Sequence, residues 1–262
     1  KPASTSVATI VPQDAGGGSA TSTRRSRGTP SPAAAASPRL DTPIPAIHGQ
    51  ILTALRSSGS QDEAQMAFHA EEADDVAAVL RYAPAAARRA AALASHREAA
   101  AQFERALRFA ADTDEATAAA LYVDLAEELL LLDRIEEAAE AIGRGLELWR
   151  AVGDRRSEGD ATRRLSSVLW HLARGQEATA AAETAVAILE PLPAGIELAR
   201  AYANLAARRM MAARHEEATE AAQRARSIAA AQSAPDVVSD ALNTEAVSAF
   251  YLGREWTGLM ER

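Results

Sequence analysis

Apolar residues after Ala46 recur with helical spacing, and no stretch alternates β-branched and polar residues with period two. This pattern predicts an all-α chain without a sheet. Two alternating sets of helices are expected. The first set covers residues 115–132, 155–172, 196–212 and 236–252, the second set covers 95–110, 135–152, 176–190 and 215–231, and further helices are expected near 75–93, 46–57 and 61–73.

One short pattern recurs along the chain. Its last residue, here called the anchor, is Ala99, Ala138, Ala178, Ala218 and, in a degraded fifth copy, Gly258, so the spacings are 39, 40, 40 and 40 residues. Small residues also recur seven positions after the first four anchors, as a close helix–helix contact requires. Helix, turn and helix in this order are typical of a tetratricopeptide repeat (TPR), whose usual period is about 34 residues. The extra residues here fall after the second helix of each copy.

A single helix pair cannot cover its own apolar face, so stacking must supply the core. We therefore predict a TPR-like α–α superhelix, a solenoid of about 4–5 helix pairs. Arg134, Arg174, Arg214 and Arg254 occupy the turns, where each is expected to neutralise the exposed carbonyls of the first helix. The Glu before each of the first four anchors lies in the first turn of the second helix, where the helix dipole favours a negative charge. Pro84 either opens its helix as the first residue or kinks it.

The amino-terminal segment has a different composition. Pro, Gly, Ser, Thr and Ala make up 32 of residues 1–45, which lack periodic apolar positions. Such a segment cannot offset the chain entropy lost on ordering, so we predict a disordered low-complexity tail. Residues 46–74 are expected to form short helices leading into the repeats, and residues 75–262 the repeats, the last one truncated. The missing initial Met and an end within an expected helix indicate a piece of a larger protein.

Charge and composition exclude several classes of function. The net charge is −8, and because residues 1–45 carry five basic and two acidic residues, the rest carries −11. A region with this negative charge is a poor match for the phosphate backbone of nucleic acid, so we expect no direct nucleic-acid binding. The chain has no Cys, which excludes disulfides and cysteine nucleophiles. No apolar run approaches about 18 residues, so we expect no membrane span and a cytoplasmic protein.

Residues suited to catalysis or cofactor binding are not found in a recognisable arrangement. Lys1 is the only lysine, and no Gly-rich loop precedes a helix and a lysine, so no ATP or other cofactor site is expected in this fragment. The five histidines show no spacing typical of metal ligands. Adjacent acids such as Glu127 and Glu128 are better explained as solvated helix faces than as paired catalytic carboxylates. We therefore predict that the chain is not an enzyme.

Binding is the function that a helical solenoid offers, and its first helices line the inner face. The repeat register places a candidate groove for an effector or a peptide there, lined by Arg163, Trp170, His171, Arg200, Met210, Asn243 and Tyr251. The alternative is that Trp170, Met210 and Tyr251 are ordinary packing between repeats. The expected partners are a protein or a second copy of the chain, and a small-molecule effector is a further candidate.

Several runs are more specific than a generic repeat. Residues 69–73, 80–90 and 96–100, together with residues 148–154, 159–161 and 189–193, resemble actinobacterial large ATP-binding transcriptional regulators of the LuxR family. The resemblance covers residues 47–262. It implies a parent protein in which an ATPase domain precedes TPR-like repeats that sense an effector or self-associate, and a helix-turn-helix domain follows them. Residues 1–45 depart from this layout, because they do not resemble the end of an ATPase domain. The alternative function is a stand-alone TPR scaffold that mediates protein–protein interaction.

Overall fold

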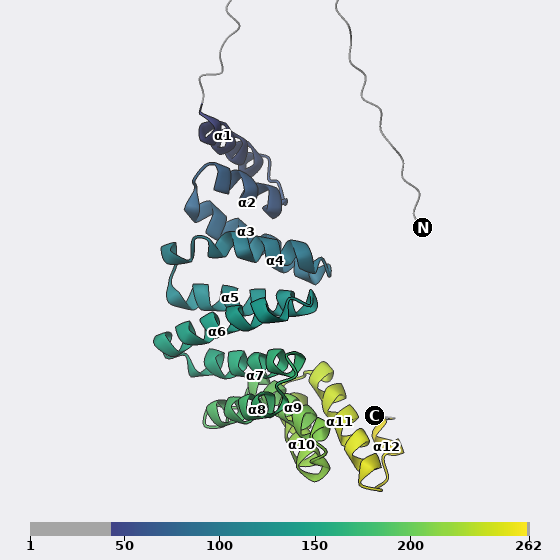
Figure 1. The fold of residues 1–262 in the computed structure, drawn as a ribbon. Helices are drawn as coiled ribbons and strands as arrows, with labels where there is room; N and C mark the ends of the chain where they lie inside the picture. The colour runs from purple at the N-terminus through teal and green to yellow at the C-terminus, as the bar shows by residue number, and fades with distance from the viewer. Residues whose placement is uncertain (1–42, 261–262) are drawn as a thin grey trace, which may run out of the picture. The chain divides into compact units, whose positions relative to one another are not determined.

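The computed structural model describes residues 43–260, and these residues form helices but no β-strand (Figure 1). The predicted all-α fold is thus confirmed for this part of the chain. In chain order the elements are α1 (Ile44–Ser57), α2 (Glu63–Glu72), α3 (Val76–Ala92), α4 (His96–Leu107), a single 3₁₀ turn (Ala110–Asp112), α5 (Glu115–Leu131), α6 (Ile135–Val152), α7 (Arg155–His171), α8 (Gly175–Leu189), α9 (Ile196–Met211), α10 (His215–Ala231), α11 (Pro235–Tyr251) and α12 (Thr257–Met260).

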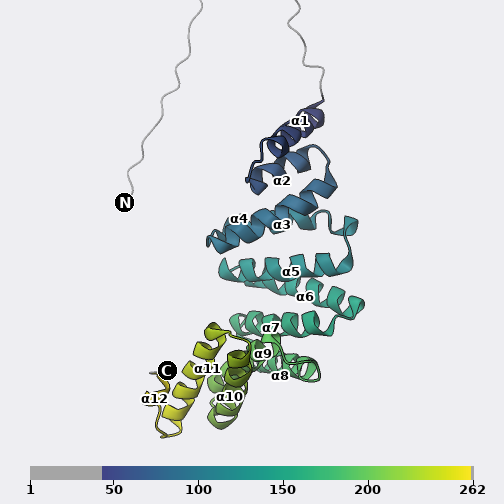
Figure 2. The ribbon, with the colours of Figure 1, turned by 180° about the vertical axis from the view of Figure 1, so that it is seen from behind.

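Each of these helices packs against the next one along the chain. The first helices of successive repeats also touch one another, α5 with α7, α7 with α9, and α9 with α11. Figures 1 and 2 show the antiparallel pairs α5–α6 and α7–α8 following one another as a stack. The core between them is therefore built from contacts between neighbouring units, as the repeat predicts.

The turn inside each repeat has the same backbone geometry in all five copies. The residue five positions before the anchor is left-handed, with φ between 55° and 65°, at Ala94, Asp133, Ala173, Ala213 and Gly253. The next residue donates its backbone N–H across the turn, for example from Arg174 to the Leu169 carbonyl at 2.9 Å. This bond and the left-handed residue form a Schellman motif, which satisfies carbonyls that the end of the first helix leaves free.

Small residues let the paired helices approach closely. The first four anchors are fully buried, and so are the alanines seven positions after them in three repeats. At the same position in α6, a Cβ added to Gly145 would lie 2.8 Å from Val123 Cγ2 and 3.1 Å from the Ala119 carbonyl oxygen. A side chain at residue 145 would therefore require Val123 and the α5 backbone to move away.

The turn arginines do not act as we predicted. Arg134, Arg174 and Arg214 are the N-cap residues of the second helices. Their side chains form two-pronged ion pairs with the glutamates three positions later, and Nε to Oε1 is 2.7 Å in each. Carboxylates in the first helical turn thus attract these guanidinium groups away from the carbonyls of the preceding helix. The glutamates themselves lie in the first turn, as expected.

Two local expectations need correction, and the fifth copy differs from the others. Pro84 lies inside α3, so the hypothesis that it opens the helix is wrong. Helix α1 begins at Ile44, inside the segment predicted to be a tail, and residues 1–42 of that segment lie outside the described residues. In the fifth copy, α12 begins at Thr257, one position before the anchor, whereas α10 begins three positions before its anchor. Among the described helices, none has the length and apolar character needed to span a membrane.

Candidate functional site

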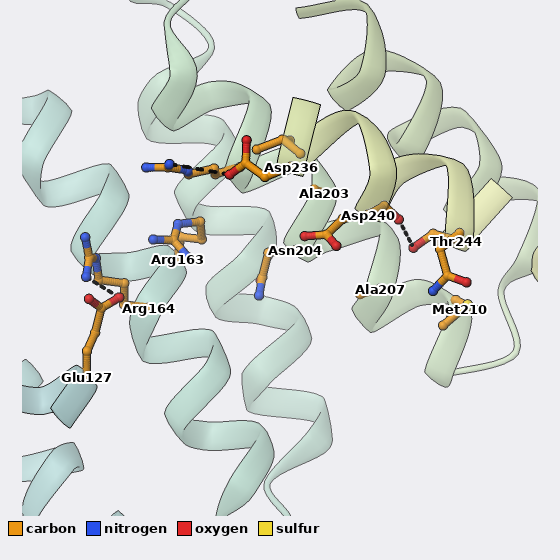
Figure 3. A pocket seen from close by; sticks show the side chains of 13 residues that line it. Glu127, Arg163, Arg164, Ala203, Asn204, Ala207, Met210, Asp236, Asp240 and Thr244 are labelled. Carbon is orange, nitrogen blue, oxygen red and sulfur yellow. Dashed lines mark hydrogen bonds and ion pairs between the residues drawn. The ribbon is translucent and has the colours of Figure 1, made fainter. Parts of the chain in front are cut away.

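A groove of about 620 Å³ lies along the first helices of consecutive repeats (Figure 3). Helices α5, α7, α9 and α11 all contribute to it, so the groove exists only because the repeats stack. We call it the first-helix groove. Its lining consists of Glu127, Arg163, Arg164, Arg200, Ala203, Asn204, Ala207, Met210, Asp236, Val237, Asp240, Asn243 and Thr244.

The structure brings together four of the seven residues that the sequence predicts for a groove. Arg163, Arg200, Met210 and Asn243 all line the first-helix groove. They come from three helices, and 80 positions separate the first from the last of them in the chain. Whether they bind a ligand remains a prediction, whereas their common location is a property of the fold.

The other three predicted residues lie elsewhere, in the last turns of α7 and α11. Trp170 is half-buried and stacks under the guanidinium of Arg208, 4.4 Å from the ring centre. His171 is exposed, and its Nδ1 lies 2.8 Å from the Ser167 carbonyl oxygen in its own helix. Tyr251 is exposed and stacks on the ring of His215, with the ring centres 4.7 Å apart. Trp170 and Tyr251 lie seven positions after the lining residues Arg163 and Thr244 and so on the same helical faces, but about two turns further along α7 and α11, beyond the end of the groove.

An ion-pair network spans the α5–α7 side of the groove. Asp160 accepts hydrogen bonds from Arg163 Nε at 2.9 Å and from Arg164 Nε at 2.8 Å. Arg164 also pairs with Glu127 across to α5. Burial alone raises the pKa of Asp160, but the two guanidinium groups outweigh it and hold the pKa below its ordinary value. Asp160 is therefore ionised at neutral pH and fixes both arginines.

The α9 and α11 sides of the groove are less tightly paired. Arg200 meets Asp236 at 3.8 Å, beyond hydrogen-bond distance. Asn204 donates to Ser167 Oγ at 3.3 Å. Among the described residues, no basic side chain forms an ion pair with Asp240, which is exposed. The side chains of Arg163, Asn204 and Asp240 come together from three successive first helices in Figure 3.

Several lining residues were missed by sequence reasoning, yet the repeat carries a signal for them. Asn204 lies 40 positions after Arg164 and 40 before Thr244, and Arg200 lies 40 before Asp240. Extending the predicted groove by one full period finds Asp240, from Arg200, and Ala203, from Arg163, whereas Asn204 and Thr244 are related by the period only to each other and to Arg164. Glu127 has no such signal, because its contribution depends on how far α5 lies from α7. No cluster of three or more potential metal ligands occurs in residues 43–260.

Comparison with known proteins gives structural neighbours only. No protein-family model and no curated protein sequence matches the chain. TPR-like repeats of a putative kinesin light chain from Podosopora anserina match with 20% identity, 70% coverage of this chain, 92% of that one and a TM-score of 0.57. A Rap protein complexed with competence and sporulation factor matches with 14% identity, coverages of 83% and 62%, and a TM-score of 0.60.

A third neighbour has several domains. It is a signal transduction ATPase with a tetratricopeptide repeat sensor from Pyrococcus horikoshii, with 15% identity, coverage of 79% of this chain and 32% of that one, and a TM-score of 0.57. Likeness at such low identity carries information on the fold and none on activity. The described residues of this chain therefore have the fold of a TPR-like helical solenoid.

Proposed function

We propose that residues 43–260 form a protein-interaction module whose first-helix groove receives a segment of a partner protein. The observation that carries the proposal is the groove itself. It is assembled from four first helices and presents polar side chains, among them Arg200, Asp240 and Asn243, that form few bonds within the chain. Polar groups that converge in a hollow and keep bonding capacity are typical of a binding site. The proposal assigns no catalytic step to this module.

We further propose that the module is the sensor and interaction segment of a LuxR-type, ATP-dependent transcriptional regulator in the cytoplasm. Two observations support this assignment. The runs at residues 80–90 and 148–154 resemble those regulators, and one structural neighbour is an ATPase that carries a TPR sensor. ATP would then bind to another domain of the parent protein, and the repeats would bind a protein partner, a second copy or an effector. A stand-alone TPR scaffold is the competing assignment.

Site-specific crosslinking in the native host tests the groove. A photoreactive residue replaces Asn243, which lines the groove, or Arg144, an exposed residue of α6 that lies outside it. We expect discrete crosslinked products from position 243, fewer from position 144, and loss of the first set when Arg200→Gln is added. Equal products from both positions would contradict binding in the groove.

The full reading frame tests the regulator assignment. A LuxR-type parent must encode an ATPase domain before these repeats and a helix-turn-helix domain after them. In that protein, Arg200→Gln should change the transcription of target genes without changing the protein level, because it alters the sensor and leaves the other domains intact. A reading frame with neither domain would leave the scaffold as the better assignment.

A further inference from the structure

Two arginines of the first-helix groove have hydrogen-bond donors that the chain does not use. Arg163 donates from Nε to Asp160, but no described residue accepts a bond from its Nη1 or Nη2. Arg200 has no hydrogen-bonded acceptor, and its nearest carboxylate, Asp236, lies 3.8 Å away. Both side chains line the same groove, one from α7 and one from α9. Neither arginine has a buried side-chain nitrogen without a partner, so these donors face solvent and are available to an acceptor from another molecule.

The third arginine of the groove, Arg164, forms ion pairs with two acidic residues of the chain. Arg164 pairs with Asp160 and with Glu127. Both carboxylate oxygens of Asp160 accept bonds from Arg163 and Arg164, and Asp160 forms no ion pair with Arg200. Of the three arginines, Arg163 and Arg200 therefore keep donors that a carboxylate of another molecule can reach, although Asp236 and Asp240 also line the groove.

Resting on the proposed function, we infer that the partner segment carries a carboxylate, from Asp or Glu, that docks between Arg163 and Arg200. A planar guanidinium matches a carboxylate with two parallel hydrogen bonds. Asp160 holds Arg163 in place, and the side chain of Arg163 is only 16% exposed, so little side-chain entropy is lost on binding. The exposed amide of Asn243 and the carboxylate of Asp240 face the same groove and can bond the backbone of the bound segment.

The net charge of the chain, −8, does not prevent this contact. At physiological salt the Debye length is about 8 Å, so distant acidic residues are largely screened. The two arginines, Arg163 partly buried and Arg200 exposed, act at hydrogen-bond distance, which is shorter than the screening length. Overall charge therefore slows the approach of an acidic segment more than it weakens the docked state.

A display library of random dodecapeptides, selected on the full chain, tests the inference. We expect groove-binding peptides to share one Asp or Glu, and its replacement by Asn or Gln to weaken binding about tenfold or more. Arg200→Gln in the protein should weaken the binding of the acidic peptide to the same degree. In this variant, replacing the acidic residue of the peptide should change the affinity little. Arg144→Gln is the matched control, because Arg144 is 70% exposed on α6 and outside the groove.

The outcomes separate the two proposals. Peptides that respond to Asn243→Ala but lack an essential acidic residue would overturn the carboxylate inference and leave the groove as a binding site. A selection that yields no peptide sensitive to Asn243→Ala or Arg200→Gln would count against both. Arg163→Gln is a second variant for the same binding test. Because it removes the bond to Asp160, thermal denaturation checks that the variant is still folded. Unchanged binding of acidic peptides to folded Arg200→Gln would also overturn the inference.

Discussion

At the scale of single residues, the turns of the repeat carry a local cost. Ala173 and Ala213 are exposed and have φ values of 56° and 57°, a region in which an L-residue is less stable by about 1–2 kcal/mol. Gly253 occupies the equivalent position in the last copy, where it has no such penalty. The alanines persist because neighbouring helices fix the geometry of the turn.

Replacing Ala173 by Gly is therefore expected to stabilise the protein. The left-handed penalty disappears, and the greater freedom of Gly in the unfolded chain offsets part of the gain, which leaves about 0.5–1 kcal/mol. Urea unfolding of the two proteins measures the difference. The control is Ala180→Gly, an exposed site inside α8, where Gly should destabilise by about 1 kcal/mol. If both substitutions destabilise equally, the turn is not strained.

At the scale of elements, the separation between paired helices depends on single glycines. Gly143 and Gly145 lie two positions apart in α6 but on different faces. A Cβ at residue 143 would meet no atom within 4 Å, whereas a Cβ at residue 145 would meet Val123 at 2.8 Å. The first glycine is thus free to change, and the second fixes how closely α6 approaches α5.

These two sites predict opposite effects of one substitution. Gly143→Ala should stabilise the protein by up to about 1 kcal/mol, because Ala is the better helix former. Gly145→Ala gains the same propensity but pushes Val123 and the α5 backbone away, so we expect a net loss of about 1–2 kcal/mol. Thermal melts followed by circular dichroism compare the variants. A stable Gly145→Ala protein would show that α5 and α6 separate at little cost.

At the scale of the described solenoid, the buried apolar residues form two main groups. One extends from Leu52 in α1 to Val168 in α7, and the other from Ala182 in α8 to Ala241 in α11. They meet at α7 and α8, where buried positions include Thr162 and Ser166 instead of large apolar side chains. In a repeat protein each unit is stabilised mainly by its neighbours, so the two groups should unfold with partial independence.

Leu205→Ala and Leu121→Ala test this independence. Both leucines are buried, one in each group, and truncation should cost about 2–5 kcal/mol. We expect Leu205→Ala to speed amide hydrogen exchange in α8–α11 and to leave α2–α5 nearly unchanged, and Leu121→Ala to do the reverse. Faster exchange along the whole solenoid in either variant would mean that the described residues unfold as one unit.

The candidate site could be read from the sequence only in part. The 40-residue period is enough to place Arg163, Arg200 and Asn243 on equivalent faces of first helices, and all three line the groove. Trp170 and Tyr251 lie on the same helical faces, about two turns further along, where they pack on Arg208 and His215 instead of lining the groove. Assigning a residue to the right helix and face was therefore easier than finding where along the helix the groove ends.

The sequence by itself determined the helices, their pairing and the turn that joins them, because spacing, small residues and turn residues act over a few positions of the chain. Only the tertiary structure decided which charges are paired. Arg163 and Arg164 are neighbours in the sequence. Arg164 pairs with both Asp160 and Glu127, whereas Arg163 pairs only with Asp160 and keeps free donors in the groove. The pairs with Asp160 lie within α7, but the pair of Arg164 with Glu127 joins two helices, and stacking sets the distance between them.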